Sequence, residues 1–327
     1  MTTPLESYPD LAQAIGVSSL YFKREDMHPY GSHKGRSIPH MIDEYRSRGE
    51  TRFAISSSGN AALAAAMHIK KLNERTNEVH EESLGNDDFS PLELDIFVGN
   101  HIAPNKEDKL KAYASEYIRI LKKERPLQAL TEAMHSGARS LRQSTDDLAL
   151  VGYESLGQEI ADAFSQKGKT KSSKSNVKSE EKIGAIFIGT SSGTTAQALA
   201  SFFLNKAQAN ESPVSTPQIH IVQTSTCHPL ADAFNSYDGP TEEYSDADAI
   251  TDITALRKIA LTPLIEKTGG SGWYATNEDI ETAQMLVKKH AGIDISPNSA
   301  LSVVGAMQSV YAGHNIDGAV ICLICGE

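Results

Sequence analysis

The sequence predicts an α/β fold with two parallel-sheet domains, and three observations support this prediction. Apolar runs typical of strands, such as residues 94–98, alternate with helical segments, as they do in βαβ units. Two strands, ending near residues 55 and 188, each lead through a loop of small polar residues into an alanine-rich helix. The length of 327 residues suits about two domains, each with its own core.

The charge and the distribution of apolar residues argue against some classes of partner. The net charge of −11 argues against nucleic acid or an anionic membrane surface as the main partner. Residues 1–5 lack both the basic region and the apolar core of a signal peptide. The apolar run at 319–325 is far too short to span a bilayer. We therefore expect a cytoplasmic protein with no membrane and no nucleic acid among its partners.

The first 50 residues are expected to place a lysine at the start of a helix. Pro29 and Gly31 form a turn after a short predicted strand. Ser32 is a good N-cap for a helix that begins near His33. Lys34 then lies in the first turn, where the backbone dipoles disfavour its charged form. This placement suits a nucleophile that must be available as a free amine, and a solvated surface lysine is the plain alternative.

Strands and helices then alternate to about residue 146, with one interruption. Residues 70–90 are rich in Asn, Glu and Asp and show little periodicity, which predicts a solvated acidic insertion, with partner binding as the alternative. The other elements expected here are strands at 51–55, 94–98 and 117–120, and helices at 61–67, 105–113 and 126–141.

The second half of the chain continues the α/β pattern. Residues 166–182 are rich in Lys and Ser but have no interleaved aromatic residues, so we predict a flexible surface loop rather than a nucleic-acid site. An acidic loop is expected at 239–248. The other expected elements are strands at 185–188, 219–222 and 319–325, and helices at 152–164, 277–290 and from 296 onward.

The three cysteines are not predicted to form a metal or redox centre. Cys322 and Cys325 have the C-x-x-C spacing that is common in such centres. They fall, however, in a predicted buried strand, where residues three apart face opposite sides of the sheet. We therefore predict neither a metal site nor a disulfide at this pair.

The lysine and the two polar loops together predict a cofactor. Loops 56–60 and 189–195 each join a strand to a helix, so each directs a row of backbone N–H groups at an anion. A lysine and two anion sites fit a cofactor that carries an aldehyde and a phosphate, bound together with a substrate carboxylate. Pyridoxal 5'-phosphate has these two groups.

In their order and spacing, these motifs resemble the fold-type-II pyridoxal-phosphate enzymes, the tryptophan synthase β-like family that includes threonine synthase, threonine dehydratase and cysteine synthase. The resemblance runs nearly end to end, and residues 222–223 with 227–234 are most similar to threonine synthases. It implies a homodimer and a cofactor in the cleft between a large domain of residues 1–34 plus 147–327 and a small domain of residues 35–146. The matching segments are Thr3-Pro4-Leu5, 23–36, 57–60, 152–155 with Glu159, 189–195 and Cys325-Gly326.

The resemblance implies roles for the lysine and for the first loop. Lys34 would carry the Schiff base, and Asn60 would contact the 3-hydroxyl of the pyridine ring or serve only as a helix cap. Ser57, Ser58, Gly59 and Asn60 would hold the substrate carboxylate. Ser58 has a second implied role as a base on the far face of the cofactor, as in racemases of the family.

The resemblance also implies a phosphate cradle and a ring contact. Two cradle positions, Ser191 and Thr194, fall where the family commonly has glycine, and a side chain there limits positive φ and close backbone approach. Cys325 stands where the family has Ser or Thr beside the ring nitrogen, and a thiol is the weaker donor. A packed core cysteine is the alternative. The cradle residues are Gly189, Thr190, Ser191, Ser192, Gly193, Thr194 and Thr195.

The implied reaction begins with removal of the α-proton of a small amino acid by Lys34 and continues with loss of a β or γ substituent. Threonine synthase, which forms threonine and phosphate from O-phosphohomoserine, is the first expectation. Tyr30 and His33 depart from its usual residues. A serine/threonine dehydratase is second, although Ala61 replaces the histidine usual in dehydratases, and a cysteine synthase-like enzyme is third. The alternative of another class is a catalytically silent relative that binds a metabolite or partner, against which Lys34 and Asn60 count.

Overall fold

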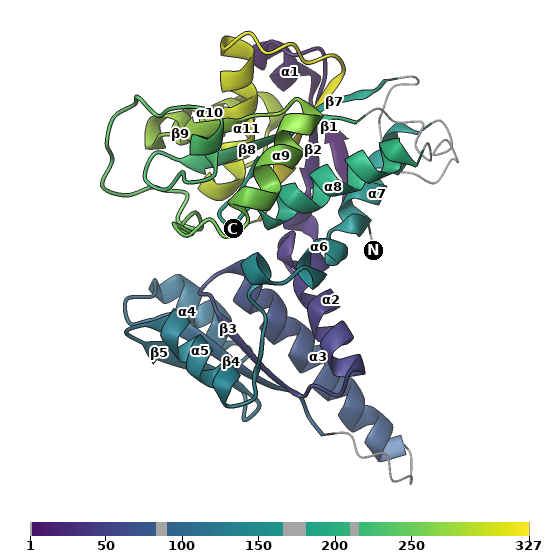
Figure 1. Ribbon diagram of the computed structural model, residues 1–327, viewed down its shortest axis with the longest axis vertical. Helices are drawn as coiled ribbons and strands as arrows, with labels where there is room; N and C mark the ends of the chain where they lie inside the picture. The colour runs from purple at the N-terminus through teal and green to yellow at the C-terminus, as the bar shows by residue number, and fades with distance from the viewer. Residues whose placement is uncertain (1, 83–89, 166–180, 210–215, 327) are drawn as a thin grey trace. The chain divides into compact units, whose positions relative to one another are not determined.

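The computed structural model describes residues 2–82, 90–165, 181–209 and 216–326 (Figure 1). The chain divides into two compact units, one formed by Met1–His28 with Tyr153–Glu327 and the other by Pro29–Gly152. Each unit contains a sheet of mainly or wholly parallel strands, which confirms the predicted α/β fold class. The predicted domain limits, after residues 34 and 146, stay a prediction, because compactness alone does not define a folding domain.

The sheet of the larger unit joins the two ends of the chain. Its strand order is β1-β2-β10-β7-β8-β9, with β1 antiparallel to β2 and the other pairs parallel. The second strand of the chain therefore lies beside the last one. The strands are β1 (Leu5–Ser7), β2 (Leu20–Arg24), β7 (Ile183–Gly189), β8 (Gln218–Thr224), β9 (Gly272–Ala275) and β10 (Ala319–Ile324).

The helices of the larger unit form two groups. α1, α10 and α11 pack on one another, and α8 packs against both α7 and α9 (Figure 1). The first group shares a core with the sheet, which includes Phe187 and Cys322 of the sheet and Val304 of α11. The elements are α1 (Pro9–Ile15), η1 (Glu25–Met27), α7 (Glu154–Phe164), α8 (Thr194–Gln208), η4 (Ala231–Ala233), α9 (Lys258–Thr268), α10 (Asn277–Ala291) and α11 (Pro297–Tyr311).

The smaller unit has a parallel sheet of four strands in the order β5-β4-β3-β6. Ile55 and Ile96 pack into one apolar cluster with α2 and α3, whereas their neighbours Ala54 and Phe97 pack into another with α5. Both faces of the sheet are thus covered, as parallel sheets require. The elements are α2 (Lys34–Ser47), β3 (Arg52–Ser56), α3 (Asn60–Glu82), β4 (Glu93–Gly99), α4 (Pro104–Lys111), β5 (Ile118–Lys123), α5 (Pro126–His135), β6 (Arg139–Ser140), η2 (Gln143–Thr145) and α6 (Leu148–Gly152).

The predicted acidic insertion at 70–90 is wrong for its first half. Residues 70–82 continue α3, a helix of 23 residues, and residues 83–89 lie outside the described residues. Leu72 packs against the core of this unit, and the side-chain amide of Asn73 exchanges two hydrogen bonds with the backbone of Leu92, at 3.0 and 2.9 Å. These two residues anchor a polar stretch whose composition alone shows no buried face.

The helix predicted for 152–164 is found as α7, which begins two residues later than predicted, and the short helix α6 that precedes it was not predicted. α6 ends in a close approach: a Cβ on Gly152 would lie 2.6 Å from the Cα of Ser37 and 2.8 Å from the carbonyl oxygen of Arg36. α6 therefore packs backbone against backbone on α2. The predicted loop at 166–182 lies outside the described residues except for its last two positions.

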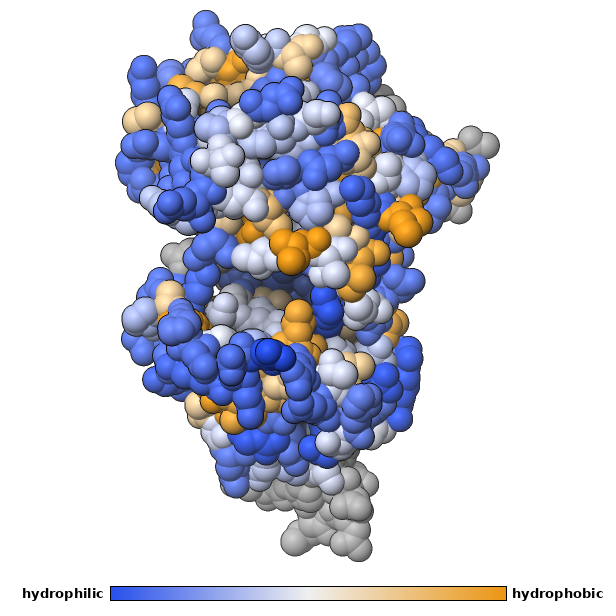
Figure 2. Space-filling view, turned by 60° about the vertical axis from the view of Figure 1, so that its left-hand side comes forward, coloured by the Kyte–Doolittle hydropathy of each residue, from blue (hydrophilic) through white to orange (hydrophobic). Residues whose placement is uncertain are grey.

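Polar groups cover most of the surface seen in Figure 2. The exposed large apolar side chains of the described residues include Ile253 and Ile259, which are 80% and 90% exposed. Within the described ranges, every helix is too short or too polar to cross a bilayer.

Candidate cofactor and substrate residues

The turn before α2 presents Lys34 as the first residue of the helix. Gly31 has a φ of +72°, a left-handed conformation that glycine adopts without strain. The hydroxyl of Ser32 accepts a hydrogen bond from the backbone N–H of Lys34 at 3.3 Å, while His33 occupies the residue just before the helix. The Lys34 side chain is half-buried, and none of the described residues pairs with its ammonium group. The predicted helix start is thus found within one residue.

The serine loop between β3 and α3 forms the start of a long helix. The hydroxyl of Ser57 accepts a hydrogen bond from the N–H of Gly59 at 3.3 Å, and the carbonyl of Gly59 accepts one from Leu63 at 3.1 Å. Asn60 is the first residue of α3, and Ser57–Asn60 are all half-buried. Because the first N–H groups of a helix have no intrahelical acceptor, this loop can bind a carboxylate.

The glycine loop between β7 and α8 makes its sharpest turn at Gly193, which has a φ of +81° and precedes the first residue of the helix. The N–H of Gly193 donates to the hydroxyl of Thr190 at 3.0 Å, and the N–H of Thr190 donates to the carbonyl of Val222 at 2.9 Å. None of the described residues accepts from the backbone N–H of Thr194 or Thr195. These groups point out of the helix start, where a phosphate would be stabilised.

Ser191 and Thr194 do not disturb this loop, although each stands where the family commonly has glycine. Among the described non-glycine residues only Ala255 has a positive φ, so neither position requires the left-handed conformation. The Ser191 hydroxyl accepts hydrogen bonds from the N–H groups of Thr251 and Asp252, both at 3.0 Å. The hydroxyls of Ser192 and Thr194 lie 2.8 Å apart and bond to each other. The extra side chains thus make contacts of their own.

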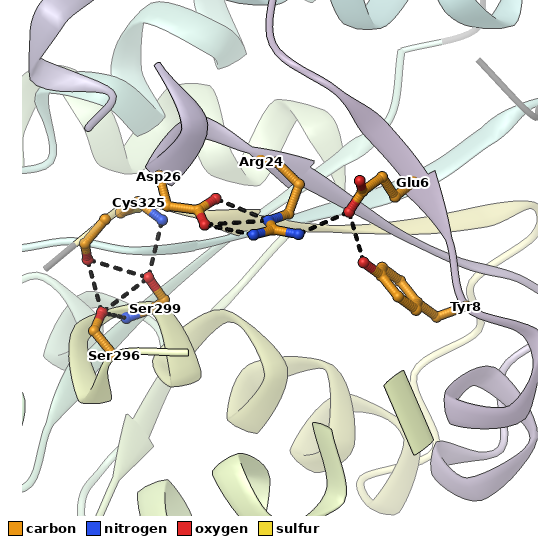
Figure 3. Close-up of polar contacts among 8 residues, drawn as sticks. Glu6, Tyr8, Arg24, Asp26, Ser296, Ser299 and Cys325 are labelled. Atoms are coloured by element: carbon orange, nitrogen blue, oxygen red, sulfur yellow. Dashed lines mark hydrogen bonds and ion pairs between the residues drawn. The ribbon is translucent and has the colours of Figure 1, made fainter. Parts of the chain in front are cut away.

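Cys325 follows β10 and is held by the start of α11 (Figure 3). Its backbone N–H donates to the hydroxyl of Ser299 at 3.1 Å. The hydroxyls of Ser296 and Ser299 both donate to the carbonyl of Gly326, at 2.7 and 3.2 Å. Two serines therefore hold the backbone of Cys325 and Gly326. Its contact with the ring nitrogen stays a prediction.

The C-x-x-C residues make separate contacts. The Cys322 thiol is completely buried and donates to the carbonyl of Ser302 at 3.4 Å, and burial raises its pKa. The Cys325 thiol lies 3.7 Å from the carbonyl of Leu323. All cysteines of the described residues are free thiols.

Lys23, on β2, forms an ion pair for which the sequence predicted no role. The ammonium of Lys23, 2% exposed, lies 2.6 Å from the carboxylate of Glu159 and donates to the carbonyl of Thr3 at 2.8 Å. Lys23, Glu159 and Thr3 all belong to segments that carry the family resemblance. That resemblance was the available signal, but no local pattern pairs residues 136 positions apart.

A second network extends from the same strand (Figure 3). Arg24 donates to both oxygens of Asp26, at 2.7 to 3.2 Å, and to Glu6 at 2.8 Å. The Asp26 and Glu6 carboxylates raise the pKa of Arg24 against the opposing effect of burial. Tyr8 donates to Glu6 at 2.6 Å, and burial together with that carboxylate raises the pKa of Tyr8 to about 12. This network ties β1 to the segment that leads to the lysine turn.

The residues present fit a cofactor with an aldehyde and a phosphate. The smaller unit contains Lys34, whose ammonium pairs with none of the described residues, and a helix start that can bind a carboxylate, and the larger unit contains a helix start preceded by a left-handed glycine. The backbone at Gly189 also lies close to α11, because a Cβ on Gly189 would be 2.9 Å from the carbonyl oxygen of Asn298. The predicted site residues are thus divided between the two units.

Comparison with known proteins places the whole chain in one family. The family model described as "Pyridoxal-phosphate dependent enzyme" matches residues 1–326. A threonine synthase of Methanosarcina acetivorans is 25% identical over 338 residues, which cover 99% of this chain and 74% of the relative. The L-serine dehydratase/L-threonine deaminase of Bos taurus is 38% identical over 72 residues, 22% of each chain.

Solved structures share the fold. A pyridoxal 5'-phosphate-dependent aspartate racemase superposes with a TM-score of 0.73 at 17% identity, covering 100% of this chain and 90% of the other. The processed form of threonine deaminase isoform 2 from Solanum lycopersicum gives 0.70 at 19% identity, covering 100% and 84%. The match over residues 1–326, together with these neighbours, confirms the resemblance found in the sequence. The chain belongs to the pyridoxal-phosphate-dependent enzyme family, and its cofactor is pyridoxal 5'-phosphate.

Proposed function

We propose that the protein is a threonine synthase that converts O-phosphohomoserine and water into threonine and phosphate. One observation carries the proposal: the threonine synthases of two archaea align along 99% of this chain, whereas the dehydratase matches cover about a fifth of it. Ala61, directly after Asn60, also departs from the dehydratase pattern.

Each part of the site has a proposed task. Pyridoxal phosphate, when bound, supplies an electron sink that makes the α-proton of an amino acid acidic. Lys34 holds the cofactor and, once displaced by the substrate amine, takes that proton at its Nζ atom. The N–H groups and hydroxyls of Ser57, Ser58 and Gly59 hold the substrate carboxylate, with Asn60 oriented toward the ring hydroxyl. Ser58 as a second base is the additional role we retain.

The phosphate of the cofactor is assigned to the loop from Gly189 to Thr195. The hydroxyl oxygen of Ser191 already accepts two backbone hydrogen bonds, so its proton is the part left to donate. Because two N–H groups donate to the hydroxyl oxygen of Ser191, its own O–H becomes a stronger donor. Ser191 thereby supplies a phosphate contact where the family commonly has glycine. Cys325 is proposed to face the ring nitrogen.

A serine/threonine dehydratase is the second candidate. It is favoured by 38% identity over 72 residues to the bovine L-serine dehydratase/L-threonine deaminase. Tyr30 and His33, which depart from the usual threonine synthase residues, also lower the specific support for phosphohomoserine. A cysteine synthase-like reaction is third, and a silent metabolite-binding relative is opposed by the retention of Lys34 and Asn60. The proposed homodimer would be tested by measuring the mass of the protein in solution by sedimentation.

The test compares the values of kcat/KM for phosphate release from O-phosphohomoserine and for ammonia release from threonine or serine. We expect the first to be larger. Lys34→Ala should abolish turnover and the borohydride-stable adduct. Faster deamination would refute the synthase assignment while leaving the Lys34 assignment in place, and no turnover of any of these amino acids by the loaded protein would favour the silent relative.

A further inference from the structure

A chain of three hydrogen-bonded side chains in the smaller unit lies outside every role assigned so far. The hydroxyl of Tyr30 is 2.7 Å from Nδ1 of His68, and Nε2 of His68 is 2.9 Å from a carboxylate oxygen of Asp43. The tyrosine and histidine rings meet edge to face, with centroids 5.9 Å apart. Tyr30 lies in the turn before α2, Asp43 lies on α2 and His68 lies on α3.

Chemistry determines the direction of both hydrogen bonds. The Asp43 carboxylate can only accept, so Nε2 of His68 carries the proton and donates it. In the neutral imidazole Nδ1 is then the acceptor, and the phenol of Tyr30 donates to it. His68 is 7% exposed, and burial, followed by the charge of Asp43, raises the pKa of Tyr30, so the phenol keeps its proton. The imidazole is thus held at both ends in one orientation.

The two helices that this imidazole joins begin at residues assigned to the cofactor. Asp43 is nine residues after Lys34, the start of α2, and His68 is eight after Asn60, the start of α3. At 1.5 Å per residue these positions are about 14 and 12 Å along their helices. A bond between them therefore holds the two helix starts at a similar level.

Apolar packing alone would not fix the position of α2 along α3. Met41 of α2 shares an apolar cluster with Ala65 and Ile69 of α3, and apolar contact is not directional, so sliding of one helix along the other is only weakly opposed. The bonds of His68 are directional and lose their geometry when either helix moves by about an ångström. The hydrogen bond from Tyr30 to His68 also connects the turn before Lys34 to the two helices. A threonine, the usual residue of the family at this position, would be too short to reach His68 from this backbone.

We propose that Tyr30, His68 and Asp43 are positioning residues that hold Lys34 in register with Asn60. The proposal rests on the proposed role of Lys34. A loosened register would leave the protein folded but would present the lysine to the cofactor less rigidly.

The test measures how fast hydroxylamine displaces Lys34 from the cofactor in the holoenzyme, followed by absorbance. Tyr30→Phe removes only the phenol oxygen and should speed displacement three- to tenfold, and Asp43→Ala should do the same. The double variant should be no faster than either single one, because both act through His68. Asp43→Asn, which keeps an acceptor oxygen for Nε2–H, should stay near the unsubstituted protein.

Tyr45→Phe is the matched control, because Tyr45 also lies on α2 and its hydroxyl donates to Asp146. It should lower the midpoint of thermal unfolding about as much as Tyr30→Phe without changing the displacement rate. Equal rates for the two variants, or single effects that multiply in the double variant, would overturn the proposal. Borohydride mapping distinguishes failure of this proposal from failure of the Lys34 assignment. If the adduct is on Lys34 and the displacement rates are unchanged, only the positioning role of Tyr30, His68 and Asp43 is refuted. If the adduct is on another lysine, the Lys34 assignment itself is refuted.

Discussion

At the scale of single residues, the conformation of Gly193 sets the shape of the phosphate loop. Any other residue there must adopt a φ near +81°, and its Cβ would lie 2.7 Å from a methyl group of Leu261. We expect Gly193→Ala to lower the free energy of unfolding by about 1–3 kcal/mol, the usual cost of such strain. The dissociation constant of pyridoxal phosphate should rise at least tenfold, as measured by fluorescence titration.

Gly99→Ala is the matched control, because Gly99 ends β4 with a negative or extended φ and open space around its Cα. It should leave cofactor affinity unchanged. Equal cofactor affinity in the two glycine variants would show that the phosphate binds elsewhere.

The Lys23–Glu159 pair predicts a large effect on stability. Removing Glu159 takes the carboxylate away from the buried ammonium of Lys23, and breaking a buried ion pair in this way typically costs 3–5 kcal/mol. We therefore expect Glu159→Ala to lower the free energy of unfolding in urea by about that amount. Lys23→Met in the same chain should recover part of the loss. Glu44→Ala, which removes an exposed partner of Arg48, should have little effect, and a similarly small effect of Glu159→Ala would contradict the account.

At the scale of elements, β8 buries a histidine that must remain neutral. His220 stacks on Phe187 with ring centroids 4.5 Å apart. Its Nδ1 accepts from the Trp273 indole and from the N–H of Ser271, both at 3.1 Å, so its Nε2–H donates to Gln218. Burial lowers the pKa of His220 to about 3, with His314 adding to the effect.

The sign of the resulting pH dependence follows from linkage. In the unfolded chain a histidine takes up a proton below a pKa of about 6.5, whereas folded His220 resists protonation down to about 3. The contribution of His220 to the free energy of unfolding is therefore complete above pH 6.5. It is lost as the pH falls, by at most about 1.4 kcal/mol per pH unit. Urea unfolding between pH 7 and 4 should show this slope, and His220→Gln should reduce it. An unchanged slope in the variant would place the effect in other groups.

At the scale of the whole molecule, the smaller unit is a continuous stretch of chain with a covered sheet and its own core. We expect residues 29–152 to fold when expressed alone, because a unit that buries its own apolar faces needs no further chain. Circular dichroism should show helix and strand with a cooperative thermal transition. A non-cooperative transition would show that this unit depends on the segments that flank it.

Local patterns predicted much of the fold because strands, turns and helix starts depend on near neighbours. The strand, loop and helix order around Ser57 and around Gly193 follows from small residues between apolar runs, and the helix start at Lys34 follows from a turn residue and a hydroxyl. The prediction was wrong at residues 70–82, where two anchoring residues hold a polar helix. It was also wrong at residues 139–140, which were predicted to be helical and instead pair with β3 as the strand β6.

By itself the sequence determined the α/β class, the family and its cofactor, and the positions of the candidate lysine and anion-binding loops. Only the tertiary structure decided which distant residues meet: Lys23 with Glu159, Tyr30 with His68, and the hydroxyl of Ser191 with residues 251–252. The physical reason is that such pairings depend on the order of strands in each sheet and on how helices pack across it. Neither is specified by the periodicity of any single segment.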